Sequence, residues 1–164
     1  MKHPITQTHN GVDVYVDLVK SPAAAHIAAQ PRLLGLVKEA LGQTIAKGDA
    51  IRMERDMGRS IGYDFVTETT GEDMVFYAQI MHDTAYTRFI KSGTPRSTQY
   101  LTIVLQRDGA DKYELYDAWI GRLTPPQPGN TNETADSKPY WAAHAFILDG
   151  RPLQTRTVTK ECPY

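Results

Sequence analysis

A β-hairpin expected between Tyr100 and Gly121 constrains the fold of this 164-residue chain more than any other feature. Two runs rich in β-branched and aromatic residues flank Asp108-Gly109, and an Asp-Gly pair between such runs is a strong hairpin signal. With a loop of two or four residues, one face is apolar and is expected to lie in the core. That face carries Leu101, Ile103, Leu105, Tyr116, Ala118 and Ile120. The mixed opposite face, which can line a site, carries Thr102, Val104, Tyr113, Leu115, Asp117 and Trp119. A loop of three or five residues would change this assignment, because a one-residue slip moves side chains to the other face.

Helices are predicted on both sides of the hairpin. Ser21-Pro22 provides an N-cap and a favoured first helical residue for a helix that runs through Ala29. Apolar residues at spacings of three and four predict an amphipathic helix over roughly residues 31–46. A short helix over 84–91 would place Thr84, Arg88 and Lys91 on one face. A last helix begins near residue 136 and carries Tyr140, Trp141 and His144 on one side.

Strands are predicted for the remaining regular segments. Alternation over 12–18 is typical of a half-buried strand, and shorter strands are expected near 51–55, 62–67, 74–80 and 155–160. The chain is therefore expected to have an α+β fold. We expect a single antiparallel sheet of about five or six strands, with helices packed mainly on one face, in a single domain spanning 1–164.

Composition limits the possible functions. The formal net charge of -1 provides no global field that would attract nucleic acid or an anionic membrane. The single cysteine, Cys162, excludes an internal disulfide, and the absence of a long apolar run argues against a membrane partner. We therefore expect a cytoplasmic protein. The known spacings of zinc, calcium and phosphate-loop motifs are absent, so neither a metal nor a cofactor is expected.

Several residue types suited to metal-free RNA cleavage are present. In such chemistry a neutral base, usually His, removes the 2′-hydroxyl proton, and cations and hydroxyl donors hold the phosphate. The catalytic candidates are His82, Arg88, Lys91, Thr102, Tyr113 and His144. Aromatic side chains can stack unpaired bases, although each has an equally good role in a core. The substrate-binding candidates are Arg59, Trp119, Tyr140 and Trp141.

This inventory and layout resemble the barnase/EndoU/colicin/RelE-type group of small metal-independent ribonucleases over roughly residues 31–120. The resemblance implies active residues on the sheet and its neighbouring helix: Arg88, Lys91, Thr102 and Tyr113, with a histidine from position 82 or 144. It also implies single-stranded RNA as substrate, and ribonuclease or phosphodiester-processing activity as the function. Arg59 with Ser97-Thr98-Gln99 is similar to elements of ADP-ribosyltransferases, but no counterpart of their catalytic Glu is found, and that interpretation is set aside.

Two other interpretations stay open. The chain can instead be a non-catalytic binding or immunity-type protein that contacts a protein partner through the aromatic, proline-rich region 119–144. Separately, the loop from Arg55 to Gly62 contains two glycines and two arginines. It is either a solvated tight turn or a loop that contacts an anion.

Overall fold

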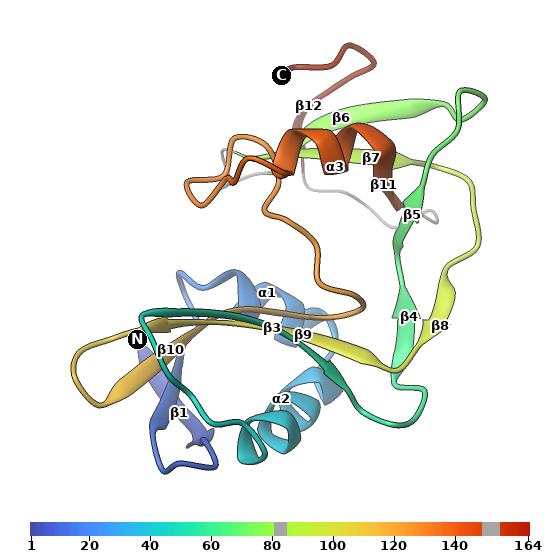
Figure 1. Cartoon of the computed structure of the whole chain (residues 1–164). Coiled ribbons are helices and arrows are strands. Elements are labelled where there is room, and N and C mark those ends of the chain that lie inside the picture. Colours follow the sequence, from blue (N-terminus) through green and yellow to red (C-terminus); the bar gives the residue numbers. More distant parts are fainter. Residues whose placement is uncertain (81–84, 149–154) are drawn as a thin grey trace. The chain divides into compact units, whose positions relative to one another are not determined.

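The computed structural model describes residues 1–80, 85–148 and 155–164 (Figure 1). The chain divides into two compact units. Unit 1 consists of residues 1–62 and 97–123, and unit 2 of residues 63–96 and 124–164. The expectation of one domain stays a prediction, and each unit is described by itself.

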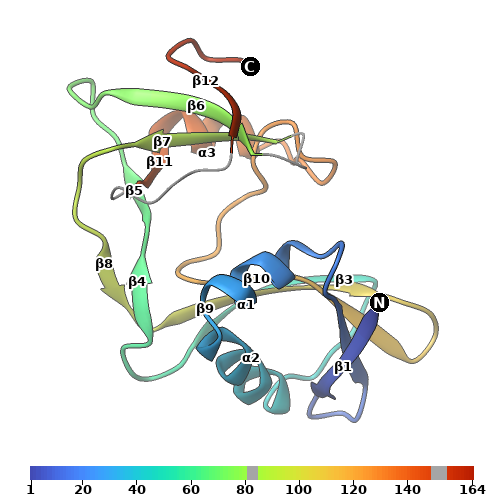
Figure 2. The same cartoon turned by 180° about the vertical axis from the view of Figure 1, so that it is seen from behind.

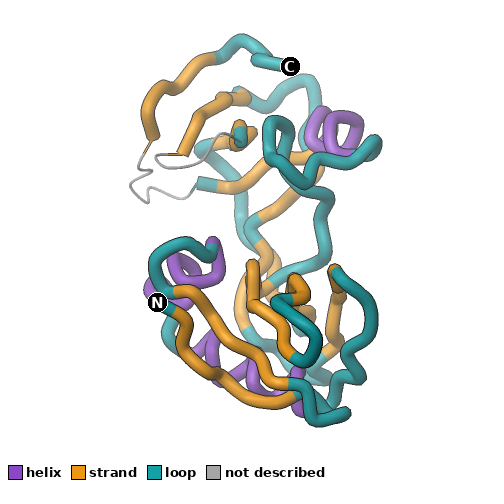
Figure 3. The backbone as a smooth tube through the Cα atoms, turned by 90° about the vertical axis from the view of Figure 1, so that its left-hand side faces the viewer, coloured by secondary structure: helices purple, strands orange, loops and turns teal. Residues whose placement is uncertain are grey.

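The predicted single sheet with helices on one face is wrong. The described residues form three separate sheets, two of five strands and one of two, and their three helices are short (Figure 3). Periodicity indicates which segments are strands, but it does not indicate which strands pair. The segments between residues 63 and 96 pair with strands near the C-terminal end of the sequence instead of extending the sheet of the hairpin.

Unit 1 is a mixed five-stranded sheet in the order β1-β2-β10-β9-β3. Strand β10 pairs with β2 in parallel, and the other neighbours are antiparallel. Helices α1 and α2 connect β2 to β3, and they are visible together in Figure 2. The elements are β1 (Lys2–Gln7), β2 (Asp13–Asp17), α1 (Pro22–Ala29), α2 (Arg32–Gly42), β3 (Ala50–Asp56), β9 (Tyr100–Arg107) and β10 (Lys112–Ile120).

Apolar side chains from the helices and the sheet form the core of unit 1. The α2 residues Leu33, Val37 and Leu41 recur on one helical face, and all three are buried. They belong to one cluster with the central strands, including Leu101 and Ile103 of β9. The two helices predicted between Ser21 and residue 46 are therefore confirmed, and α2 ends at Gly42 rather than near residue 46.

The predicted hairpin is confirmed, but its faces are only partly as expected. Leu101 lies opposite Ile120, as a two- or four-residue loop requires, whereas Leu105 lies opposite Leu115. The N–H of Asp108 donates to the carbonyl of Lys112, so the loop has three residues, with Gly109 at φ +87°. The two ends of the hairpin therefore differ in register by one residue, and a bulge between Leu115 and Asp117 accommodates this difference.

The bulge decides which side chains of the hairpin enter the core. Leu115 and Tyr113 join the core cluster, while Tyr116, which was expected there, is only half-buried. Thr102, expected on an open face, is completely buried, and its Oγ1 donates to the carbonyl of Gly121 at 3.0 Å. The expectation that Thr102 and Tyr113 line an open face is therefore wrong.

Unit 2 is a mixed five-stranded sheet in the order β12-β6-β7-β11-β5. Strand β11 pairs with β7 in parallel, and the other neighbours are antiparallel. Strands β4 and β8 pair with each other where the chain passes between the units. The remaining elements are β4 (Gly62–Asp64), β5 (Val66–Glu68), β6 (Val75–Ile80), β7 (Tyr86–Ile90), β8 (Arg96–Thr98), α3 (Ser137–Ala143), β11 (His144–Ile147) and β12 (Thr155–Thr159).

The helix predicted over 84–91 is wrong, because the segment Tyr86–Ile90 is the strand β7. Its residues are mostly aromatic or β-branched, which suits a pleated, half-buried surface. The strand has neighbours on both sides, β6 and β11, and their hydrogen bonds override the helical spacing of the basic residues. Arg88 and Lys91 are consequently three residues apart along an extended chain, and their side chains leave opposite faces.

Two faces of the unit 2 sheet follow from its register. Phe89 lies opposite Phe76 on one side and Phe146 on the other, and the first two rings stack at 5.5 Å. Trp141 of α3 stacks on Phe146 at 5.2 Å, so α3 covers this face. We call it the α3 face. The opposite face carries Ile90, Ala145 and Ile147 together with Arg88 and Tyr77.

Candidate ligand-binding site in unit 1

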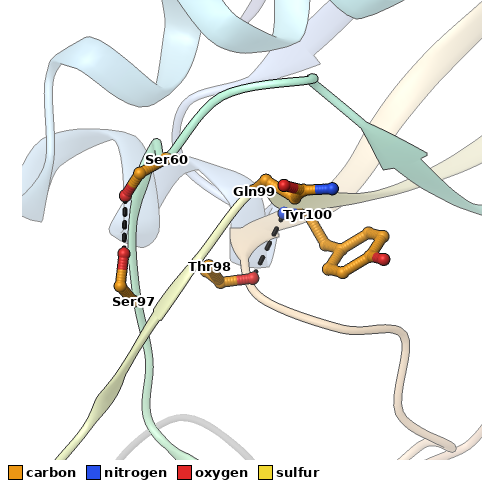
Figure 4. Close-up of a pocket in the computed structure, with 5 residues that line it drawn as sticks. All are labelled: Ser60, Ser97, Thr98, Gln99 and Tyr100. Atoms are coloured by element: carbon orange, nitrogen blue, oxygen red, sulfur yellow. Dashed lines mark hydrogen bonds between the residues drawn. The ribbon is translucent and has the colours of Figure 1, made fainter.

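A polar cavity of about 370 Å³ lies at the start of β9 (Figure 4). It is lined by Ser60, Ser97, Thr98, Gln99 and Tyr100. Three of these five side chains are small hydroxyls, one is an amide and one is a phenol. The cavity therefore offers hydrogen bonds in both directions and one aromatic ring.

Backbone hydrogen bonds hold the loop that carries Ser60 against the other wall. The N–H of Met57 donates to the carbonyl of Gln99 at 2.9 Å, and the N–H of Ile61 donates to that of Thr98 at 2.8 Å. Gly58 lies between these two bonds at φ +69°, a left-handed conformation that a side chain disfavours. This loop was predicted to be either a solvated turn or an anion-contacting segment, and the structure makes it one side of a cavity.

The hydroxyls of Ser60 and Ser97 join the two walls. Their Oγ atoms are 2.6 Å apart, and one of them donates to the other (Figure 4). Both residues are exposed, so the second hydroxyl proton and the remaining lone pairs can reach a ligand. Gln99 is fixed by its Nε2, which donates to Asp56 Oδ2 at 2.8 Å, and its Oε1 is the remaining acceptor.

The ring of Tyr100 is held by a charged neighbour. The guanidinium of Arg122 lies 4.0 Å from the ring centroid, a cation–π contact. Arg122 is itself positioned by Glu54, whose Oε2 accepts from Nε at 2.9 Å. One face of the Tyr100 ring is thus covered by Arg122.

A second cavity of about 430 Å³ adjoins the first and shares Ser60 with it. It lies beside α2 and carries two guanidinium groups. Arg59 donates to both carboxylate oxygens of Glu39 at 2.8 Å, and these bonds lower the pKa of Glu39 and raise that of Arg59. Arg32 makes no ion pair with any described residue. The lining residues are Arg32, Gly35, Leu36, Glu39, Arg59, Ser60 and Ile61.

Of the ten residues predicted from the sequence as site residues, Arg59 is the one that lines these cavities. Tyr113 is buried, and its hydroxyl donates to the carbonyl of Gly48 at 2.6 Å, a structural role. Trp119 is half-buried, and its Nε1–H donates to the carbonyl of Arg122 at 3.1 Å. Trp119 thus supports the backbone next to the Arg122 side chain.

Three predicted residues lie together on the α3 face of unit 2. The rings of Tyr140 and His144 stack with their centroids 3.9 Å apart, and the two ring planes are nearly parallel, with an angle of 1° between them. Trp141 meets Tyr140 edge-on at 5.2 Å, is buried, and donates its Nε1–H to the carbonyl of Pro125. Burial raises the pKa of Tyr140 to about 12, and the charges of Asp64 and Glu68 add to that effect.

The other predicted cations of unit 2 are not grouped with His144. Arg88 contacts the backbone carbonyl of His144, but its side chain leaves the opposite face of the sheet from the imidazole. Lys91 is exposed, with Nζ 4.5 Å from the centroid of Phe76. His82 lies outside the described residues. The predicted partner region 119–144 is divided between the units at residue 123.

Sequence reasoning missed Ser60 and the run Ser97–Tyr100 as site residues. One signal is the similarity of Arg59 with Ser97-Thr98-Gln99 to elements of ADP-ribosyltransferases, because it pairs the same two segments. The sequence did not show that Ile61 and Thr98 are hydrogen-bonded, which brings those elements together.

Comparisons with protein-family models, curated proteins and solved structures found no match for this chain. No group of three or more histidine, cysteine or acidic side chains suited to a metal ion occurs within residues 1–80, 85–148 and 155–164. The helices in that same part of the chain are all too short or too polar to cross a bilayer.

Proposed function

We propose that this protein binds a phosphodiester ligand, single-stranded RNA being the class that fits, through the two adjoining cavities of unit 1. One observation carries the proposal: Ser60 lines both a cavity with an aromatic ring and a cavity with two guanidinium groups. Single-stranded RNA presents bases and phosphates alternately at short intervals, and it needs a site with both kinds of contact.

Arg32 and Arg59 are the residues that would contact the phosphates. A guanidinium matches the geometry of a phosphate and is less strongly hydrated than an ammonium. Arg32 has its full charge available, whereas the charge of Arg59 is offset by Glu39. The hydroxyls of Ser60 and Ser97 add neutral donors between the two cavities.

Tyr100 and Gln99 are the residues that would contact the bases. An aromatic ring already packed on a guanidinium is held in place, so little side-chain freedom is lost when a base contacts it. The Oε1 of Gln99 can accept from a base edge, because its Nε2 is committed to Asp56. With few cations in the site and a net charge of -1, binding is expected to be moderate.

The test is equilibrium binding of a fluorescent single-stranded RNA of mixed sequence, about ten nucleotides long. Arg32→Met is expected to weaken binding by about tenfold, the effect of losing one charge-assisted phosphate contact. Lys38→Met is the matched control, since Lys38 is an exposed cation of the same helix and lines neither cavity. No binding by the wild type, or equal losses in both variants, would contradict the proposal.

A second candidate function, metal-independent RNA cleavage, is favoured by one observation in unit 2. His144 Nδ1 lies 2.9 Å from the carbonyl oxygen of Tyr140. A neutral imidazole in this position donates its Nδ1–H, which leaves the Nε2 lone pair as a base. The resemblance to small ribonucleases assigns a base role to histidine, and the contact of Nδ1 with the carbonyl of Tyr140 favours the tautomer that this role needs.

Single-turnover cleavage of the same RNA, with a chelator present, tests this second function. His144→Gln is expected to lower the rate a hundredfold or more, the usual contribution of a general base. His9→Gln, a substitution of an exposed histidine in unit 1, is the control. If the wild type cleaves no RNA, the cleavage function is wrong and the binding proposal is unaffected.

A further inference from the structure

The face of the unit 2 sheet opposite α3 carries a buried arginine with no acidic partner. Arg88 is only 9% exposed, and it makes no ion pair with a described residue. A buried cation is costly unless it is paired or strongly hydrogen-bonded. The hydrogen bonds of Arg88 therefore decide whether its charge is satisfied within the fold.

Arg88 uses two of its three nitrogens within the fold. Nε donates to the hydroxyl of Tyr77 at 3.3 Å, and Nη1 donates to Thr69 Oγ1 and to the carbonyl of His144, both at 2.9 Å. The hydroxyl of Thr69 is fully engaged, since it also donates to the carbonyl of Ala143. Nη2 has no hydrogen bond to a described residue.

Two tyrosine hydroxyls next to Arg88 have unused protons. Tyr77 accepts from Arg88, and its own O–H proton has no acceptor among the described residues. Tyr164 meets Tyr77 edge-on at 5.9 Å, and its hydroxyl is buried without a hydrogen-bond partner in the part of the chain that the structure describes. Burial raises the pKa of Tyr164 to about 12, so this hydroxyl keeps its proton and is a donor at neutral pH.

Arg88 Nη2, Tyr77 and Tyr164 together offer N–H and O–H donors around one positive charge. A ligand that accepts hydrogen bonds and carries negative charge satisfies these donors and offsets the charge of Arg88. We infer that Arg88, Tyr77 and Tyr164 form a binding site for a small oxyanion, either a carboxylate or a phosphate group. This site is independent of the cavities of unit 1.

Titration calorimetry of the whole protein with inorganic phosphate and with acetate, at constant ionic strength, tests the inference. Saturable binding of one or both anions is expected. Tyr164→Phe should weaken it by about tenfold, because one hydrogen bond to a charged acceptor is lost. Binding of phosphate alone would assign the site to phosphate esters, and binding of acetate alone would assign it to carboxylates.

The controls separate the site from general charge effects and from misfolding. Arg96→Met removes an exposed arginine from the same unit and should leave binding unchanged. Arg88→Gln should abolish binding, and if it does not fold, Tyr77→Phe and Tyr164→Phe still test the site. Absence of saturable binding to the folded wild type would overturn the inference. So would unchanged affinity in Tyr164→Phe, or an equal loss in Arg96→Met.

Discussion

The imidazole of His26 links α1 to β10, with Nδ1 3.0 Å from Asp117 Oδ1 and 2.9 Å from the carbonyl oxygen of Ala118. Burial lowers the pKa of His26, but the hydrogen bond and charge of Asp117 outweigh it, so the pKa of His26 is raised. The sequence offered no reason to single out this histidine. The pairing depends on α1 packing beside the bulge of β10, which no local pattern predicts.

This contact gives the protein a predictable dependence on pH. A histidine whose folded pKa is raised stabilises the fold fully below its unfolded pKa, about 6.5. That contribution is lost as the pH rises through the folded pKa. Urea midpoints measured between pH 5.5 and 8.5 should fall with pH in the wild type and fall less in Asp117→Asn. An equal fall in both proteins would contradict the assignment.

The pair of Glu39 and Arg59 should limit the affinity of unit 1 for RNA. Glu39→Gln removes the carboxylate that offsets Arg59, so binding of the single-stranded RNA is expected to strengthen by a few-fold. The slope of log affinity against log salt should steepen by about 0.7, the value for one more phosphate contact on a single strand. Glu133→Gln, a change in unit 2, is the control. A weaker binding of Glu39→Gln would place Arg59 outside the site.

The two tryptophans should differ in their contribution to stability. Trp141 is 1% exposed and stacks on Phe146, so Trp141→Ala is expected to cost about 3–5 kcal/mol. Trp119 is half-buried, and Trp119→Ala is expected to cost about 1–2 kcal/mol. Chemical denaturation of both variants measures this difference. Equal losses would mean that the Trp119 ring is as well packed as that of Trp141.

Ser21 connects the start of α1 to the bulge of β10. Its Oγ accepts from the N–H of Ala23 and lies 2.8 Å and 2.7 Å from the carbonyls of Leu115 and Tyr116. Ser21→Ala removes a helix cap and leaves buried carbonyls with one donor fewer, at a cost of about 1–3 kcal/mol. Chemical denaturation of Ser21→Ala measures this loss of stability. Ser92→Ala, which changes an exposed serine, is the control. A loss equal to that of Ser92→Ala would contradict the role of the cap.

Local patterns in the sequence predicted the elements of unit 1 better than those of unit 2. The Asp-Gly hairpin, the cap at Ser21 and the apolar stripe of α2 are short-range signals, and the structure confirms each of them. In β7 the basic residues at helical spacing predict a helix, whereas the aromatic and β-branched residues between them favour the strand that forms. The cavity at Ser60 depends on hydrogen bonds between residues 57–61 and 98–99, and no local pattern reports such bonds.

The discontinuous make-up of unit 1 has a consequence for its synthesis. Its first 62 residues include α1 and α2 but lack β9 and β10, the two central strands against which those helices pack. At ribosomal rates of about 5–20 residues per second, several seconds pass before residue 120 follows residue 62. During that interval only β1, β2 and β3 are present, so the part of the core that β9 and β10 supply to Leu33, Val37 and Leu41 is missing. The nascent chain is therefore at its most vulnerable to aggregation and proteolysis while unit 2's first strands are being made.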